Sequence, residues 1–247
     1  MSERTALHHL PELGVVLVAA GQGTRLGAGA PKAFVELGNA TLLEHSVRTI
    51  IGLPHPGELV IVVPEGFASQ ALEVVSRTIP DDSSWHASVV PGGRERHESV
   101  RFGLAALGAH VRTVLIHDAA RPLTPTAVFE RVISAVHRSG GAAVPGIPVA
   151  DTVKRVRGEV VVDTVDRAEL VAVQTPQGFP RELIEAAHES TQARASHDRR
   201  APTDDAEVVQ RFGGTVTVVD GDALAHKVTT PADLRMLLGV LDASERD

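Results

Sequence analysis

Short runs of almost continuous apolar residues recur along the chain and limit its fold more strongly than any other feature. A strand with one face in water alternates apolar and polar residues, whereas a continuously apolar strand is buried on both faces, as in parallel sheets. Helical patterns separate the runs, so the sequence predicts a Rossmann-like α/β fold, in which helices flank an open, mostly parallel sheet with right-handed crossovers. The predicted strands are 14–20, 58–64, 87–92, 113–119 and 141–146, and the predicted helices are 40–52, 66–79, 95–108 and 125–140.

Residues 148–174 interrupt this alternation. Two short β-rich runs flank a polar turn at Gly158, which predicts a β-hairpin. The hairpin follows after most of the sheet is complete and has little apolar surface to pack on it, and an isolated hairpin is only marginally stable in water. We therefore predict a β-arm over 148–174 that packs against a second subunit. A solvated surface hairpin is the alternative.

The rest of the chain predicts more elements of the same kind. We expect a helix from Pro180 to about Arg194, a short helix starting near Thr203, a strand over 215–221 and a closing helix over 231–243. The sequence has no internal repeat, low-complexity segment or clear domain boundary. Residues 1–247 are therefore interpreted as one domain.

Composition excludes several classes of function. The net charge of −7 argues against a general nucleic-acid-binding protein, although a local basic pocket can still hold a phosphorylated ligand. The 247 residues contain no cysteine, which excludes disulfides and thiolate chemistry, and the twelve histidines show no metal-ligand spacing. Neither a signal peptide nor an apolar run of about 18 residues is visible. We therefore expect a cytoplasmic protein that does not enter a membrane.

The stretch VVLVAAGQGTRLGAGAPKAF places a glycine-rich turn directly after the first predicted strand. It is not a Walker A loop, which ends in Gly-Lys-Ser/Thr, and Leu26 stands where the dinucleotide fingerprint has its third glycine. The backbone N–H groups of such a loop can close on a triphosphate. Arg25 in the loop and Lys32 at its end are cations suited to stabilising charge on a phosphorus in transfer. A plain strand-to-helix turn is the alternative.

Lysine is rare in this chain. Of 24 basic residues only Lys32, Lys154 and Lys227 are lysines, and arginine occupies the other basic positions. Because arginine does not replace lysine well where a compact point charge is needed, each remaining lysine is a candidate for such a position.

Ordered motifs over most of the chain resemble one family. The pattern AAGxGxR at 19–25 is typical of nucleotidyltransferases that act on nucleotide sugars. Later segments narrow the match: PGGRERHESV (91–100), HDAARP (117–122), DTVKR (151–155), VDR (165–167), QTPQGF (174–179) and HKVTTPADL (226–234). Together they resemble the 2-C-methyl-D-erythritol 4-phosphate cytidylyltransferase family of isoprenoid precursor biosynthesis. The resemblance implies a nucleotidyltransferase-type fold and a homodimer in which the β-arm reaches the neighbouring active site.

The resemblance also implies an activity, the transfer of CMP from CTP to a phosphorylated polyol with release of pyrophosphate. The attacking phosphate is already anionic, so catalysis depends on positioning and positive charge rather than on a strong base. Implied catalytic residues are Arg25 and Lys32 at the α-phosphate, and Arg167 and Lys227 at the attacking phosphate. Implied nucleotide-binding residues are Ala19, Ala20, Gly21, Gly23, Gly93, Arg94, Ser99, Asp118 and Ala119.

The acceptor and the metal complete these expectations. The resemblance implies that Asp118, Arg121, Thr152 and Thr175 line the acceptor pocket, with Thr152 and Arg167 supplied by the neighbouring subunit. Mg²⁺ is expected mainly on the phosphates of CTP, and no direct protein ligand is predicted. Arg94 stands where the family often has an aspartate, so it contributes either its backbone N–H or a side chain that alters the base pocket. His117, beside Asp118, is interpreted as a packed residue.

Other functions stay open at this stage. Ribitol 5-phosphate cytidylyltransferases share most of these motifs, and sugar-1-phosphate uridylyl- or guanylyltransferases are a wider alternative. A non-catalytic nucleotide-binding protein is the alternative from another class. The presence of Arg25, Lys32, Asp118, Arg167 and Lys227 argues against that last possibility.

Overall fold

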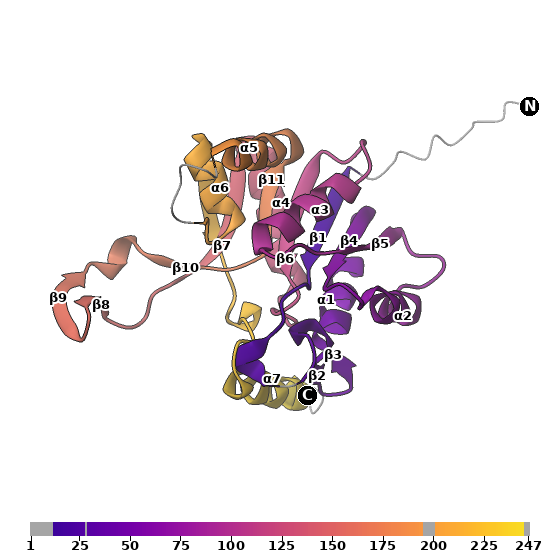
Figure 1. The fold of residues 1–247 in the computed structure, drawn as a ribbon, viewed down its shortest axis with the longest axis horizontal. Coiled ribbons are helices and arrows are strands. Elements are labelled where there is room, and N and C mark those ends of the chain that lie inside the picture. Colours follow the sequence, from indigo (N-terminus) through magenta and orange to yellow (C-terminus); the bar gives the residue numbers. More distant parts are fainter. Residues whose placement is uncertain (1–11, 28, 195–200, 245–247) are drawn as a thin grey trace, which may run out of the picture.

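The computed structural model describes residues 12–27, 29–194 and 201–244. Its main sheet has the spatial order β10-β7-β11-β6-β1-β4-β5, and β12 pairs with β7 (Figure 1). The neighbours β5, β4, β1 and β6 are mutually parallel, so the chain reverses its direction of travel across the sheet at β1. The strands are β1 (Leu13–Val18), β4 (Gly57–Val63), β5 (Trp85–Pro91), β6 (Thr113–Asp118), β7 (Ala142–Pro148), β10 (Val171–Val173), β11 (Gln177–Pro180) and β12 (Val216–Asp220).

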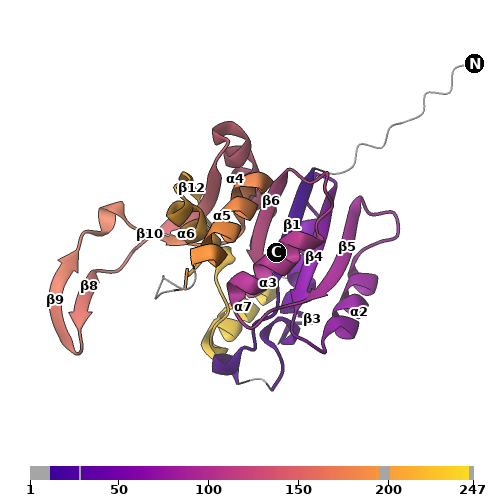
Figure 2. The same ribbon diagram turned by 45° about the horizontal axis from the view of Figure 1, so that its top comes forward.

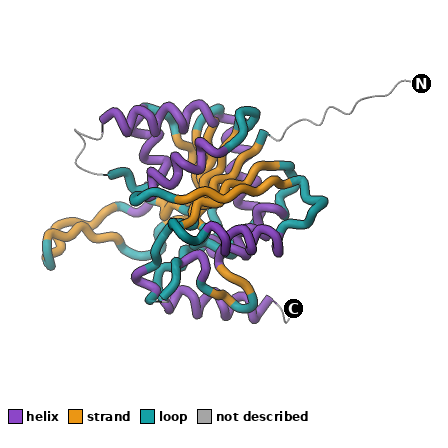
Figure 3. The backbone as a smooth tube through the Cα atoms, turned by 45° about the vertical axis from the view of Figure 1, so that its right-hand side comes forward, coloured by secondary structure: helices purple, strands orange, loops and turns teal. Residues whose placement is uncertain are grey.

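Helices cover both faces of the sheet (Figure 3). Val15 and Leu17 of β1 belong to a core shared with α1, α2 and α4, whereas Val16 belongs to a core shared with α3, α5 and α6. This two-sided burial explains the continuous apolar runs and confirms the predicted fold class. No helix within the described ranges is long and apolar enough to cross a membrane. The helices are α1 (Leu42–Ile51), α2 (Ala68–Thr78), α3 (Arg96–Ala106), α4 (Thr126–Ser139), α5 (Arg181–Arg194), α6 (Asp205–Phe212) and α7 (Pro231–Ser244).

Two strands of the main sheet are missing from the sequence interpretation, which assigns no strand to 170–179. β11 runs antiparallel between β6 and β7, and β10 runs antiparallel to β7. β11 has four residues, Gln177–Pro180, and two of them are glycine and proline. Such a segment shows neither an apolar run nor an alternating pattern, so its place in the middle of the sheet comes from tertiary packing.

The predicted hairpin is present and extends away from the body (Figures 1 and 2). It consists of β8 (Val153–Arg157) and β9 (Val160–Val165), which pair with each other and with no other strand of the described residues. Val160 and Val161 at its tip are 66% and 55% exposed. The arm therefore presents apolar side chains that its own chain does not cover, while the predicted packing on a second subunit stays a prediction.

The C-terminal helix joins the segment that follows the glycine-rich loop. α7 lies beside a short hairpin of β2 (Glu36–Leu37) and β3 (Ala40–Thr41) (Figure 1). Leu26 and Leu37 form a small separate core with Val228 and Leu237. This core fixes residues 226–230 close to the loop that follows β1.

Gly178→Ala is expected to lower the free energy of unfolding by about 1–3 kcal/mol, because overpacking a filled core forces neighbouring atoms apart. A Cβ at this position would lie 2.5 Å from Val132 Cγ1 and 2.9 Å from Val136 Cγ2, both on α4. Urea denaturation measures the change. Gly239→Ala is the control, because this helical glycine of α7 has open space around it and the substitution should be neutral or stabilising. An unchanged Gly178→Ala midpoint would contradict the tight packing of β11 under α4.

Candidate active site

The glycine-rich loop after β1 curls back on itself. Lys32 N donates to Gly21 O at 3.2 Å, and Leu26 N donates to Gly23 O at 2.8 Å. Gly23 has φ of +66°, and a Cβ there would lie 2.8 Å from Lys32 Cβ. Both the backbone conformation and the close approach require glycine at this position. Gly23 therefore shapes the loop and brings Lys32 beside Gly21.

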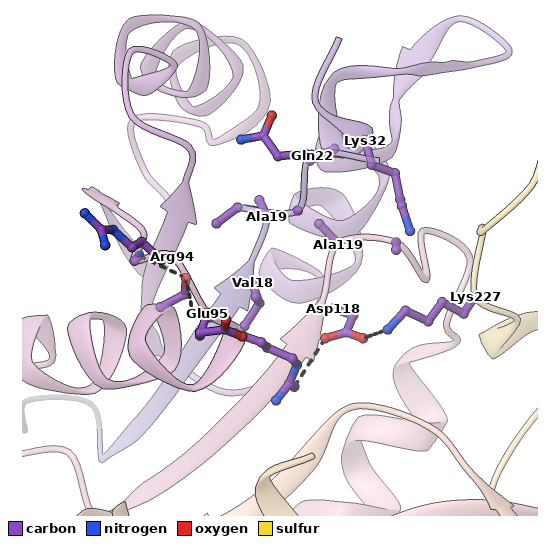
Figure 4. A pocket seen from close by; sticks show the side chains of 16 residues that line it. Val18, Ala19, Gln22, Lys32, Arg94, Glu95, Asp118, Ala119 and Lys227 are labelled. Atoms are coloured by element: carbon purple, nitrogen blue, oxygen red, sulfur yellow. Dashed lines mark hydrogen bonds and ion pairs between the residues drawn. The ribbon is translucent and has the colours of Figure 1, made fainter. Parts of the chain in front are cut away.

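A pocket opens where the carboxyl ends of β1 and β6 lie side by side (Figure 4). This is the point at which the chain reverses direction across the sheet, and ligands of open α/β sheets bind at such points. New lining residues include Gln22, Glu95 and Arg96. Of the residues expected from the sequence, those lining the pocket are Ala19, Ala20, Gly21, Lys32, Gly93, Arg94, Ser99, Asp118, Ala119 and Lys227.

One wall of the pocket is a loop closed by Ser99 and Glu98. Ser99 is buried, and its Oγ accepts from Gly93 N at 3.1 Å. Glu98 Oε2 accepts from Arg94 N at 2.8 Å and from Glu95 N at 3.1 Å, and these N–H groups hold the pKa of Glu98 below its usual value. The Arg94 N–H is thus already bonded within the loop, and the residue is exposed.

Asp118 carries a negative charge at the floor of the pocket. Its Oδ2 lies 2.6 Å from Lys227 Nζ and its Oδ1 lies 3.3 Å from Arg96 Nη2 (Figure 4). Burial of this carboxyl would raise its pKa, but the two cations hold the pKa of Asp118 well below the usual range. The carboxylate therefore stays ionised and holds Lys227 in the pocket.

Arg96 is a functional candidate that sequence reasoning missed. Its Nη1 lies 2.7 Å from Oδ2 of Asp205, which is 1% exposed at the start of α6. His188 Nε2 lies 3.5 Å from the other Asp205 oxygen. Burial opposes the charge on Arg96, but Asp205 and Asp118 raise its pKa above the usual value. Arg96 thus links the pocket carboxylate to a carboxylate in the interior.

Lys32 reaches across to the C-terminal segment. Its Nζ donates to Val228 O at 2.9 Å, and Val228 N donates to Ala120 O at 2.8 Å. Lys32 and Lys227 therefore lie at the same end of the pocket (Figure 4). Arg25 lies in the short 3-10 helix Thr24–Leu26, and its side chain falls outside the described residues.

Thr175 contacts the last two residues of β6, His117 and Asp118. Its Oγ1 accepts from Asp118 N at 3.1 Å and lies 3.0 Å from His117 Nδ1. Burial lowers the pKa of His117 to about 4, so its imidazole is neutral at pH 7 and can accept the Thr175 hydroxyl proton at Nδ1. The His117 ring lies 5.0 Å from that of Phe129, so this histidine is a packed residue, as the sequence predicts.

Several expected site residues do not line this pocket. Arg121 bonds to two separate segments of the chain: its Nη1 donates to Ala225 O at 2.6 Å, and its Nη2 donates to Val173 O at 3.4 Å. Arg167, next to the arm, donates to Ala150 O. Within the described chain, the expected residues absent from the lining are Gly23, Arg121, Thr152, Arg167 and Thr175.

Comparison with known proteins identifies a family. A family model described as 2-C-methyl-D-erythritol 4-phosphate cytidylyltransferase matches residues 13–241. A bifunctional IspD/IspF enzyme of Clavibacter michiganensis is 52% identical over 227 residues, which cover 91% of this chain and 53% of that protein, so this chain spans about half of that relative's length. A protein of Corynebacterium efficiens with the same name as the family is 43% identical, and the match covers 93% of each chain.

Solved structures give the same result for the fold. The crystal structure of 2-C-methyl-D-erythritol 4-phosphate cytidylyltransferase from Thermus thermophilus is 33% identical with a TM-score of 0.72, and the match covers 92% of this chain and 98% of that one. The 4-diphosphocytidyl-2C-methyl-D-erythritol synthase of Anaerococcus prevotii is 26% identical with a TM-score of 0.80, covering 94% and 96%.

Arg96→Met is expected to lower the free energy of unfolding by about 3 kcal/mol at pH 7, because it leaves the buried Asp205 without its cation. Asp118 and Asp205 both have a depressed pKa in the fold, so their stabilising effect is present above pH ~4 and is lost as the pH falls below it. The difference in the free energy of unfolding between the variant and the wild type should therefore be smaller in acid. Urea denaturation at pH 7 and in acid, with Arg101→Met on the same helix as control, measures it. An equal difference in the free energy of unfolding at both pH values would contradict the view that the ion pairs of Arg96 cause the loss of stability.

Proposed function

The chain belongs to the 2-C-methyl-D-erythritol 4-phosphate cytidylyltransferase family, and from this premise we propose that it transfers CMP from CTP to 2-C-methyl-D-erythritol 4-phosphate. The products are 4-diphosphocytidyl-2-C-methyl-D-erythritol and pyrophosphate. The observation that carries the proposal is the pocket itself, in which a glycine-rich loop, two lysines and one ionised carboxylate converge at the carboxyl ends of β1 and β6.

The proposed reaction is an in-line displacement at the α-phosphorus of CTP. An oxygen of the acceptor phosphate forms the new P–O bond while the bond to pyrophosphate breaks. Both reactants are anions, so the chain must bring them together and stabilise negative charge on the transferring phosphorus. A general base is unnecessary because the attacking oxygen carries no proton that must leave. His117, next to Asp118, is buried and does not line the pocket, so it is not placed to act as such a base.

Lys32 and Arg25 are proposed to stabilise the charge on the α-phosphate. Lys32 lies beside Gly21, and its ammonium group points into the pocket (Figure 4). The ammonium group of Lys32 is at the end of a flexible stem, so it can leave the Val228 carbonyl and bind a phosphate oxygen instead. Arg25 is carried by the same loop, seven residues earlier in the sequence.

Lys227 and Arg167 are proposed to orient the attacking phosphate. Support for Lys227 comes from Asp118, which holds its ammonium group at the pocket floor. Residues 19–21 and the loop around Gly93 and Ser99 are proposed to surround the base and the ribose, since they line the same pocket as the two lysines. Arg121, Thr152 and Thr175 stay proposals for the acceptor site.

Mg²⁺ is proposed to arrive with the nucleotide. Among the described residues no group of three or more His, Cys, Asp or Glu side chains could hold a metal ion. Mg²⁺ is commonly bound by one or two carboxylates together with substrate phosphates, and Asp118 is the carboxylate at the pocket floor. We propose Asp118 as its partner through water, because both carboxylate oxygens already face cations. When bound, the ion neutralises charge on the triphosphate.

A homodimer completes the proposed site. Thr152 and Arg167 flank the exposed arm and do not line the pocket of their own chain. The uncovered valines of the arm suit an interface with a second copy. We propose that the arm delivers these two residues to the neighbouring pocket, and that the enzyme acts in the cytoplasm, where CTP is available.

Pyrophosphate release tests the function as a whole. Purified wild-type protein is incubated with CTP, Mg²⁺ and one phosphorylated polyol at a time, with UTP and GTP as nucleotide controls. Release with methylerythritol phosphate and CTP supports the proposal. A preference for ribitol 5-phosphate would assign the alternative acceptor, and no acceptor-dependent release would indicate a non-catalytic nucleotide-binding protein.

Lys32→Ala is expected to lower kcat by a factor of about 10²–10³ while the dissociation constant for CTP changes much less, because its main interaction is made in the transition state. Steady-state kinetics and CTP titration measure the two effects separately. Lys154→Ala is the matched control, since this lysine donates to Thr164 on its own hairpin at 2.6 Å and should be dispensable. Unchanged turnover in Lys32→Ala would refute the assignment.

Mixing two inactive variants tests the shared site. Lys32→Ala and Arg167→Ala should each be inactive alone, but a mixed dimer would contain one intact pocket, so co-refolded protein should regain about a quarter of wild-type activity by random pairing. Deletion of residues 151–166 should give inactive monomers, as judged by light scattering. A mixture without recovered activity, or an active deletion monomer, would contradict the shared site.

A further inference from the structure

Both lysines of the pocket are tied to one short segment, residues 226–230. Lys227 supplies its own side chain, whose Nζ lies 2.6 Å from Asp118 Oδ2. The adjacent Val228 supplies its carbonyl, which accepts from Lys32 Nζ at 2.9 Å. Two charged groups that are 195 positions apart in the sequence therefore depend on the backbone position of two neighbouring residues.

The segment is held in turn by Asp233, in the first turn of α7. Asp233 Oδ2 accepts from Thr229 N at 2.8 Å and from Thr230 N at 2.7 Å, and it lies 2.9 Å from Thr229 Oγ1. Its Oδ1 lies 3.1 Å from His226 Nε2. Burial alone would raise the pKa of Asp233, but these donors hold it well below its usual value. One carboxylate thus bonds residues on both sides of Lys227 and Val228.

An ordinary helix cap explains only part of this arrangement. Thr230 and Asp233 form a capping box, in which Asp233 N donates to Thr230 Oγ1 at 3.3 Å and the carboxylate accepts from Thr230 N. The contacts with Thr229 and His226 lie outside the box and reach back along the segment. They connect Asp233 to residues on both sides of Lys227 and Val228, the two residues that contact the pocket groups.

Val228 and Asp233 each hold a different part of residues 226–230. Val228 is fully buried in the small core with Leu26 and Leu237, and its N–H bonds to Ala120 O at 2.8 Å. The middle of the segment is therefore anchored at the pocket, and Asp233 fixes how the chain leaves it.

We propose that Asp233 is a positioning residue, which sets the places of Lys32 and Lys227 together by holding residues 226–230. The inference rests on the proposed function for its effect on turnover, but the effect on the lysines is independent of it. Loss of the carboxylate removes the acceptor for the N–H groups of Thr229 and Thr230, so the segment stays anchored at Val228 but is no longer fixed on either side of it. A displacement of about 1 Å at reacting groups can lower turnover by about 10²-fold.

Asp233→Ala and Thr230→Ala separate positioning from capping. Both substitutions damage the same helix cap, but Thr230→Ala keeps the carboxylate and the Thr230 N–H, so the segment stays held. We expect kcat to fall at least about tenfold in Asp233→Ala and less than about twofold in Thr230→Ala, with the KM for CTP little changed in both. Equal losses of kcat in the two variants would overturn the proposal.

The three lysines provide a readout that needs no substrate. With lysine labelled by ¹³C at Cε, each of Lys32, Lys154 and Lys227 gives its own signal, and Lys154 on the arm serves as internal reference. In Asp233→Ala the signals of Lys32 and Lys227 should both shift, while Lys154 stays in place. Thr230→Ala should leave all three signals unchanged. Unmoved Lys32 and Lys227 signals in folded Asp233→Ala would overturn the proposal.

Two additions to the experiment keep its outcome interpretable. If Asp233→Ala does not fold, Asp233→Asn replaces it, because its amide keeps only one of the two acceptor oxygens. Smaller shifts of the same two signals support the proposal, and unmoved signals contradict it. If wild-type protein releases no pyrophosphate, the proposed function fails, while the lysine signals still decide whether Asp233 positions both side chains.

Discussion

The pocket depends on one buried negative charge, that of Asp118. A carboxylate at the end of a central strand is costly to ionise unless cations face it. Arg96 and Lys227 each occupy one of its oxygens, and Asp205 balances Arg96 from the interior. Four side chains of alternating sign thus run from the core to the pocket, so Lys227, the lysine proposed to orient the attacking phosphate, is held in place by protein contacts alone.

The sheet explains why this site could be located from the sequence. The apolar runs alternate their side chains between two cores, as Val15 and Val16 do, and only a doubly covered parallel sheet satisfies that pattern. Because parallel strands end at the same edge, the glycine turn after β1 and Asp118 at the end of β6 had to meet. Local sequence was sufficient there, since each of these residues follows its strand directly.

The contacts of Arg96 and Lys32 that sequence reasoning missed are long-range. Arg96 and Asp205 are 109 positions apart, and the acceptor for Lys32 is the backbone carbonyl of Val228, which no side-chain pattern reveals. β11 has too few residues to show a period, yet it lies in the centre of the sheet. Residue type indicates that a cation is present, whereas its partner follows only from how distant segments pack.

The arm is informative for a different reason: the described part of its own chain does not cover its apolar side chains. Val160 and Val161 are apolar, β-branched and exposed, and nothing in their own chain covers them within the described ranges. A strand pair of this length gains too little from itself to keep apolar side chains in water. Arg167 lies at the base of the same arm, away from its own pocket. The homodimer proposed above would account for both features, the exposed apolar surface of the arm and a cation that lies away from its own pocket.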